Sequence, residues 1–232
     1  GGVFRVTDGL IDRFGEERVL DTPLAENGIV GMAIGMAVYG LKPVCEIQFS
    51  GFSYQNFHQI ENHAARLRWR SRGRYQVPMV LRTPYGGGVR ALEHHSESRE
   101  AYWAHTPGIK TVVPSGPRNA RGLLVSAIRD PDPVIFYESK ALYRAFREEV
   151  PEEEETVPIG QPRIVRECKD LTKISSHDMM RPTLEAAISL KDKDGIEAEV
   201  LVLFTVSPLD EEIFLTSVLK TGLALFGHEA PR

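Results

Sequence analysis

Short apolar runs alternate with amphipathic segments along the chain, and this alternation limits the possible fold more than any other feature. In the first part, strands are predicted at residues 44–49, 79–82, 110–113 and 134–137. Helices are predicted at 54–70, with Phe57, Ile60, Ala64 and Leu67 on one face, and at 117–129. Strands that alternate with helices predict a parallel sheet covered on both faces.

The second part repeats this alternation on a smaller scale. Strands are predicted at 171–175, 199–203 and 223–227, with a helix from Pro182 to Gly195. The run Ser207-Pro208-Leu209-Asp210 matches a capping box and predicts a second helix through Thr221. Gly222 is expected to close that helix.

An acidic, proline-interrupted run at 148–155 separates the two parts and is interpreted as an exposed linker. We therefore predict a first α/β domain over 1–147, a linker over 148–160 and a smaller α/β domain over 161–232. The sequence does not begin with methionine and stops just after a strand-like run, so we expect both ends to be incomplete.

Composition excludes several classes of function. The net charge of −4 over 232 residues argues against nucleic acid as a partner. The basic run of Arg66, Arg68, Arg70, Arg72 and Arg74 is interpreted as a solvated or subunit-facing surface. No apolar stretch of membrane length occurs, and no secretory leader is expected. The two distant cysteines indicate reduced thiols, so a cytoplasmic location is expected, with a mitochondrial matrix origin also compatible.

Glu26 is the single acid at the mouth of a helix that is otherwise small and apolar. It lies in the run Asp21–Gly28, which leads into a glycine-rich segment at 27–40. A buried carboxyl at a strand-to-helix junction is a catalytic candidate. The alternative is an N-terminal acid favoured by the helix dipole.

The sequence resembles the beta subunits of the thiamin-diphosphate-dependent 2-oxoacid dehydrogenases, which include the pyruvate and branched-chain enzymes. The similarity runs in order along nearly the whole chain. It is carried by the Glu26 run and by residues 45–49, 86–90, 94–98, 105–110, 126–133, 140–144, 217–222 and 228–232. The resemblance implies a transketolase-like, pyrimidine-binding domain with a parallel sheet, followed by a truncated C-terminal α/β domain.

The resemblance also implies roles for individual residues. Glu26 matches the glutamate that hydrogen-bonds the cofactor's pyrimidine nitrogen and promotes its imino tautomer. An aromatic wall for the pyrimidine is expected from at least one of Phe49, Phe52 and Tyr54, without deciding which. His95 aligns with a histidine at the substrate and lipoyl end of the site.

Two other patterns have weaker functional interpretations. The Gly86-Gly87-Gly88 loop lacks the spacing of a phosphate-binding loop and is interpreted as a flexible segment beside the site. Some relatives hold a structural potassium ion through backbone carbonyls. The corresponding positions here are Met79, Ala127, Ile128, Asp130 and Asp132.

The chain contains no Gly-Asp-Gly run, which in thiamin enzymes binds magnesium and the diphosphate. We therefore expect an alpha subunit to supply that half of the site. The resemblance implies an α2β2 heterotetramer with beta–beta pairing, acting on the lipoyl acyltransferase core of a multienzyme complex. The close-packing helix at 27–40 is one candidate for subunit contact.

Three readings of the function remain at this point. The leading one is a pyruvate or branched-chain 2-oxoacid dehydrogenase beta subunit that transfers an acyl group to lipoyl. The second is half of a split transketolase or deoxyxylulose-phosphate synthase. The third is an assembly module that has lost catalysis. The sequence does not decide which 2-oxoacid is the substrate.

Overall fold

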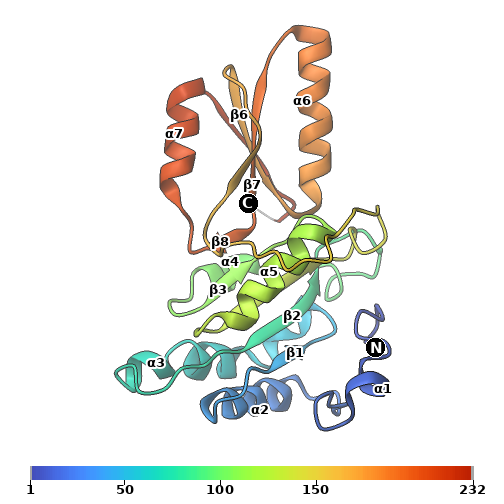
Figure 1. Cartoon of the computed structure of the whole chain (residues 1–232), viewed down its shortest axis with the longest axis vertical. Helices are drawn as coiled ribbons and strands as arrows, with labels where there is room; N and C mark the ends of the chain where they lie inside the picture. The colour runs from blue at the N-terminus through green and yellow to red at the C-terminus, as the bar shows by residue number, and fades with distance from the viewer. Residues whose placement is uncertain (1, 231–232) are drawn as a thin grey trace.

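In the computed structural model, which describes residues 2–230, the chain forms two β-sheets, the first mainly from its first half and the second from its second half (Figure 1). The first sheet has the order β1-β2-β4-β3-β8. Its strands are β1 (Val44–Glu46), β2 (Val80–Tyr85), β3 (Lys110–Val112), β4 (Val134–Ser139) and β8 (Thr205–Ser207). The strands β1 to β4 pair in parallel, as the alternation of strands and helices predicts.

The second sheet has the order β5-β7-β6-β9. Its strands are β5 (Arg163–Arg166), β6 (Leu171–Ser176), β7 (Ala198–Leu203) and β9 (Ala224–Gly227). Strand β6 pairs in parallel with both neighbours, while β5 is antiparallel to β7. The prediction of a second, smaller α/β unit is confirmed.

Helices and helical turns cover these sheets (Figure 1). In the first part they are α1 (Leu10–Phe14), α2 (Glu26–Val38), η1 (Ser50–Tyr54), η2 (Gln59–Ala64), α3 (Leu67–Arg70), α4 (Glu100–Ala104) and α5 (Pro117–Arg129). In the second part they are η3 (His177–Met179), α6 (Met180–Asp194) and α7 (Glu211–Thr221). Within residues 2–230 none of these helices has both the length and the apolar character needed to cross a membrane.

Two hydrophobic clusters lie on the two sides of the first sheet. One joins α2 and η2 to inward side chains of β2 and β4, with Trp103 fully buried in it. The other joins Leu123 and Ala127 of α5 to Val200 and Val202 of β7 and to Ala187 of α6. The second cluster therefore contains side chains from both parts of the chain, which pack together through apolar contacts.

The helix predicted over 54–70 is interrupted, and this prediction is wrong in its details. The chain forms a 3-10 turn at Ser50–Tyr54, a π-helical segment at Gln59–Ala64 and a short α-helix at Leu67–Arg70. The Ala65 amide donates to the Ile60 carbonyl, five residues back, at 2.9 Å. Such a wide turn adds a residue and rotates the face, so Ile60 and Ala64 are buried while Phe57 is 37 % exposed.

The predicted capping box at Ser207 is also wrong. Ser207 belongs to β8 and is paired with Thr111 of β3, so it is held in an extended ladder before the helix begins. Helix α7 begins at Glu211, and its N-cap is Asp210, whose side chain accepts a hydrogen bond from the Glu212 amide. Gly222 closes α7 in the left-handed conformation, as predicted.

The acidic linker is exposed along most of its length, but ion pairs fasten it to α5. Glu154 pairs with Arg129 at 2.6 Å and Glu155 pairs with Arg118 at 2.5 Å. The Arg121 guanidinium donates to carbonyls of residues 151–153. The linker therefore follows a defined path across the helix.

A histidine–glutamate pair joins the end of the second sheet to α4. The Nε2 of His228 lies 2.7 Å from a carboxylate oxygen of Glu100, whose side chain is almost fully buried. Glu100 raises the pKa of His228 above its ordinary value of 6.5, with further contributions from Glu229 and Asp178. His177 is the other histidine facing His228, with ring centroids 6.4 Å apart.

We expect the contribution of this pair to stability to depend on pH. Because the folded-state pKa of His228 is raised, the stabilisation is complete below about pH 6.5 and is lost as the pH rises through the folded pKa. The difference in melting temperature between wild type and His228→Gln should be largest near pH 6 and shrink as the pH rises through the raised folded-state pKa of His228. His105→Gln, at an exposed histidine, is the control. A difference for His228→Gln that does not vary with pH would contradict the role given to this ion pair.

Candidate active site

Glu26 is the first residue of α2 and is 8 % exposed. Among the described residues, its carboxylate has no hydrogen-bond or ion-pair partner. The helix behind it packs on η2, where a Cβ on Gly31 would lie 3.5 Å from the Gln59 side chain. A buried acid without a protein partner is available to a bound group.

The structure brings three of the predicted site residues into one aromatic cluster. The rings of Phe49 and His95 lie 4.5 Å apart, those of Phe52 and His95 5.4 Å apart, and those of Phe49 and Phe52 5.7 Å apart. All three contacts are edge-to-face, a favourable geometry for aromatic pairs. Phe49 follows β1, so the cluster lies beyond the carboxyl ends of the strands, where ligand sites of parallel sheets form.

Tyr54, the third predicted aromatic, lies outside this cluster. Its ring packs under the guanidinium of Arg99 at 3.9 Å, its hydroxyl accepts a hydrogen bond from the same group, and the residue is 54 % exposed. Its ring also faces His94, at 6.4 Å. Adjacent residues His94 and His95 thus contact different aromatic neighbours. No described contact joins Glu26 directly to the cluster.

Gly51 holds the segment that carries His95 against the segment that carries Phe52. A Cβ at position 51 would lie 2.1 Å from the His94 carbonyl oxygen, so no side chain fits without moving that backbone. Nearby, Ser50 Oγ donates to the Glu97 carbonyl at 2.8 Å. Two contacts therefore fix the His94–Glu97 loop against the start of η1.

We expect Gly51→Ala to push this loop away and to displace His95 from the aromatic cluster. Most of the catalytic turnover that the resemblance implies should be lost, and the melting temperature should fall because a backbone contact is broken. Gly35→Ala is the control for the melting temperature, because a Cβ there meets nothing within 4 Å and alanine favours a helix more than glycine does. Full activity in Gly51→Ala would show that the loop can move without affecting the site.

Several buried polar atoms gather near the ends of β2, β4 and β6. Among residues 2–230, the Tyr85 hydroxyl, the Lys140 ammonium and His177 Nε2 have no hydrogen-bond partner. The rings of Tyr85 and His177 are 4.5 Å apart, so the two sheets meet at this place. Groups that are buried without partners point to a bound molecule or a second chain.

His177 is held in an uncommon backbone conformation. It has a φ of 54°, in the left-handed region that non-glycine residues rarely adopt. Its Nδ1 lies 2.7 Å from Ser176 Oγ, and burial lowers the pKa of the ring well below its ordinary value. His177 is therefore neutral at physiological pH.

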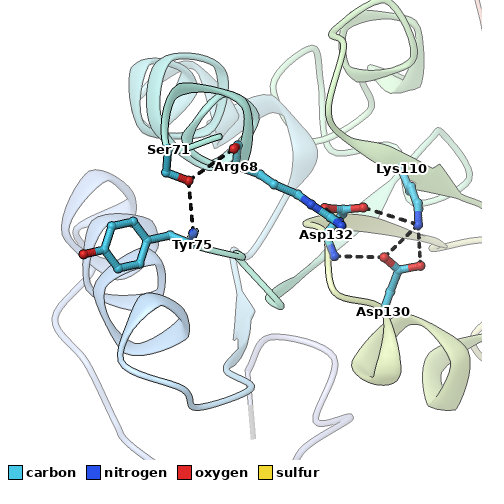
Figure 2. Close-up of polar contacts among 6 residues, drawn as sticks. All are labelled: Arg68, Ser71, Tyr75, Lys110, Asp130 and Asp132. Carbon is cyan, nitrogen blue, oxygen red and sulfur yellow. Dashed lines mark hydrogen bonds and ion pairs between the residues drawn. The ribbon is translucent and has the colours of Figure 1, made fainter. Parts of the chain in front are cut away.

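The predicted potassium carbonyls lie at the end of α5 beside two lysines. Lys42 Nζ donates to the Ile128 carbonyl at 3.1 Å, and the Met79 and Ala127 carbonyls accept from the Val134 and Asp130 amides. Lys110 contacts both Asp130 oxygens at 2.6–2.7 Å and Arg68 contacts Asp132 at 2.6 Å, as Figure 2 shows. A cation on the Ile128 carbonyl would have to displace the Lys42 ammonium. Potassium binding stays a prediction.

Sequence reasoning did not single out Lys140, which the structure places beside the aromatic cluster. Lys140 is only one of the residues 140–144, a segment that contributes to the family resemblance. A usable signal was present, because Lys140 comes three residues after the predicted apolar strand 134–137 and so falls at the carboxyl edge of the sheet. His177 and Glu100 carry no comparable signal, since their burial depends on how the two sheets meet.

The residues present fit the pyrimidine half of thiamin diphosphate. Glu26 offers a buried carboxyl without a partner, and the Phe49–Phe52–His95 cluster offers ring edges and faces in a largely buried setting. The described residues include no group of three His, Cys, Asp or Glu side chains arranged to hold a metal ion such as magnesium.

Comparison with known proteins also points to a pyrimidine-binding site in the first part of the chain. Residues 1–145 match the transketolase pyrimidine binding domain and residues 160–232 match the transketolase C-terminal domain. The chain is 52 % identical over 230 residues to the pyruvate dehydrogenase E1 component subunit beta of Acholeplasma laidlawii, which covers 99 % of this chain and 70 % of that protein. Identity is also 52 %, over 232 residues, with the same subunit of Bacillus subtilis strain 168, covering 100 % and 71 %.

A solved structure described as a split gene transketolase, inactive beta4 tetramer, superposes with a TM-score of 0.79. It is 21 % identical and the match covers 97 % of this chain and 70 % of that chain, so this likeness concerns the fold. The relatives at 52 % sequence identity identify the family as well as the fold. The chain belongs to the family of beta subunits of the thiamin-diphosphate-dependent 2-oxoacid dehydrogenases.

Proposed function

We propose that this chain is the beta subunit of a pyruvate dehydrogenase first component, which decarboxylates pyruvate oxidatively and transfers the acyl group to lipoyl. The observation that carries the proposal is the 52 % identity, along nearly the whole of this chain, to subunits named for that enzyme. The partnerless Glu26 carboxyl and the Phe49–Phe52–His95 cluster support it.

Thiamin diphosphate supplies the nucleophilic carbon of this chemistry when it is bound. The chain's own residues prepare the site. Glu26 holds a proton at the pyrimidine nitrogen, in a position where burial shields the hydrogen bond from water. Phe49 and Phe52 exclude water around the ring, and His95, held by both rings, is placed to orient or protonate a group on the substrate side.

An alpha subunit is proposed to complete the site. The diphosphate and magnesium require ligands that this sequence does not contain in the usual form, and the proposed assembly is an α2β2 heterotetramer. The lipoyl acyltransferase core of a multienzyme complex is the proposed acceptor of the acyl group. The names of the relatives, as components of pyruvate dehydrogenase, support this arrangement.

Mixing experiments test the proposal and choose between substrates. The purified chain should show no thiamin-dependent decarboxylation alone and should gain activity on addition of the cognate alpha subunit, thiamin diphosphate and magnesium. Turnover should be faster with pyruvate than with 3-methyl-2-oxobutanoate. A preference for the branched acid would move the assignment to the branched-chain enzymes. Activity on neither acid, with a correctly assembled heterotetramer, would overturn the dehydrogenase proposal.

A further inference from the structure

Lys140 is a buried lysine without a counter-charge in direct contact. It follows β4 and is 5 % exposed, and within residues 2–230 its Nζ has no hydrogen-bond partner. An ammonium group loses its hydration on burial, and this loss is offset only by an anion or by several hydrogen bonds. The Lys140 ammonium is therefore able to bind an anion without first giving up a protein partner.

The surroundings of Lys140 are those of the candidate active site. Its Nζ lies 5.7 Å from the centroid of the Phe49 ring, whose centroid is 4.5 Å from that of His95. The Lys140 amide donates to the Tyr85 carbonyl at 3.2 Å, which fixes it at the carboxyl ends of β2 and β4. The cation–π contact with Phe49 offsets part of the lost hydration but provides no negative charge.

Glu229, the acid whose charge acts on Lys140, makes its direct contacts elsewhere. Glu229 Oε1 accepts a hydrogen bond from the Gly87 amide at 2.6 Å, and a Cβ on Gly86 would lie 2.6 Å from its other oxygen. The glycine loop thus holds Glu229 in place, and Glu229 acts on Lys140 only at longer range. Burial lowers the pKa of Lys140 to about 8, with Glu229 opposing the shift, so the side chain is still mainly a cation at neutral pH.

We propose that the Lys140 ammonium binds the carboxylate of a small 2-oxoacid, beside the Phe49–His95 ring pair. The inference rests on the proposed function and adds a residue that fixes the substrate's charged end. The carboxylate is the group that leaves as carbon dioxide, so its ion pair exists before the chemical step and weakens during it. Lys140 therefore contributes to substrate binding rather than to stabilisation of the transition state.

Kinetics of the assembled enzyme test this role. In Lys140→Met, with the alpha subunit, thiamin diphosphate and magnesium present, KM for pyruvate should rise about 10- to 100-fold, the range expected for a hydrogen bond to a charged group. The value of kcat should not fall, because the lost ion pair stabilises the bound substrate more than the transition state. Lys140→Arg keeps the charge and should restore part of the affinity. Lys173→Met is the matched control, because Lys173 is also 5 % exposed but lies in β6 of the second sheet.

Binding of inert ligands gives an independent measurement. Propionate should inhibit the wild-type enzyme competitively and better than its neutral isostere propionamide, and Lys140→Met should abolish that preference. Calorimetry should find thiamin diphosphate affinity unchanged in the variant. Removal of an unpaired buried charge should also leave Lys140→Met at least as thermally stable as the wild type.

Two results would overturn the inference. An unchanged KM for pyruvate in an active Lys140→Met enzyme would show that Lys140 does not meet the substrate. Weakened thiamin diphosphate binding with an intact preference for propionate would show that the anion is the cofactor's diphosphate. A wild-type heterotetramer without activity on any 2-oxoacid would instead refute the proposed function, and the ligand-binding comparison would still report on Lys140.

Discussion

Glu26→Gln is expected to lower turnover of the assembled enzyme by at least about 10²- to 10⁴-fold, the contribution usual for a general acid–base group. Glutamine is nearly isosteric with glutamate, and Glu26 has no described protein partner, so packing at the start of α2 should survive. The amide cannot exchange a proton with the pyrimidine nitrogen, so activation of the cofactor loses its driving force. Circular dichroism and melting temperature should be close to those of the wild type.

The direct measurement is exchange of the thiazolium proton into deuterated water, at saturating cofactor. This readout isolates cofactor activation from decarboxylation and acyl transfer. Glu211→Gln is the matched control, because Glu211 is also the first residue of a helix but is exposed. If both variants exchange at the wild-type rate, Glu26 is only an acid favoured by the helix dipole.

Arg82→Met is expected to destabilise the chain by about 3–5 kcal/mol, the usual cost of removing one partner from a buried ion pair. The Arg82 side chain is 6 % exposed and donates to both oxygens of Glu138, at 2.7 and 2.8 Å, and to Glu46 at 3.1 Å. Tyr143 donates a further hydrogen bond to Glu138. Without the guanidinium, two acids remain close together on one face of the sheet.

Chemical denaturation gives the free energy of unfolding for this test. Arg129→Met is the control, because the side chains of the Arg129–Glu154 pair are more than half exposed and water screens their attraction. A loss below about 1 kcal/mol in Arg82→Met would mean that water or a structural shift compensates the two acids.

The sequence predicted the architecture because hydrophobic periodicity reports local burial. Helix α5 was predicted over 117–129 and is observed over the same residues, and Gly222 ends α7 as expected. The failures have tertiary causes. Ser207 was misread because its strand partner, Thr111, lies almost a hundred residues earlier in the chain. The wide turn at Gln59–Ala64 has no local signature in the residue pattern.

In the candidate site, too, some residues could be predicted from the sequence and others could not. Glu26, Phe49, Phe52 and His95 could be named from a resemblance, and the structure places the last three in contact. Tyr54 could not be separated from them, because its contact with Arg99 depends on the loop around 97–99. Lys140 and His177 become conspicuous only when hydrogen-bond partners are counted in three dimensions.

Because of strand β8, the first part of this chain is not expected to be stable when it is expressed alone. This strand comes from the second half of the chain, yet it covers the edge of β3 in the first sheet. A fragment ending at the acidic linker would leave the backbone groups of β3 without this partner, as well as the apolar side chains that face α6 and β7. Such a bare edge invites intermolecular strand addition. The first 147 residues expressed separately should therefore aggregate, and supplying the second half in trans should recover soluble material by strand complementation.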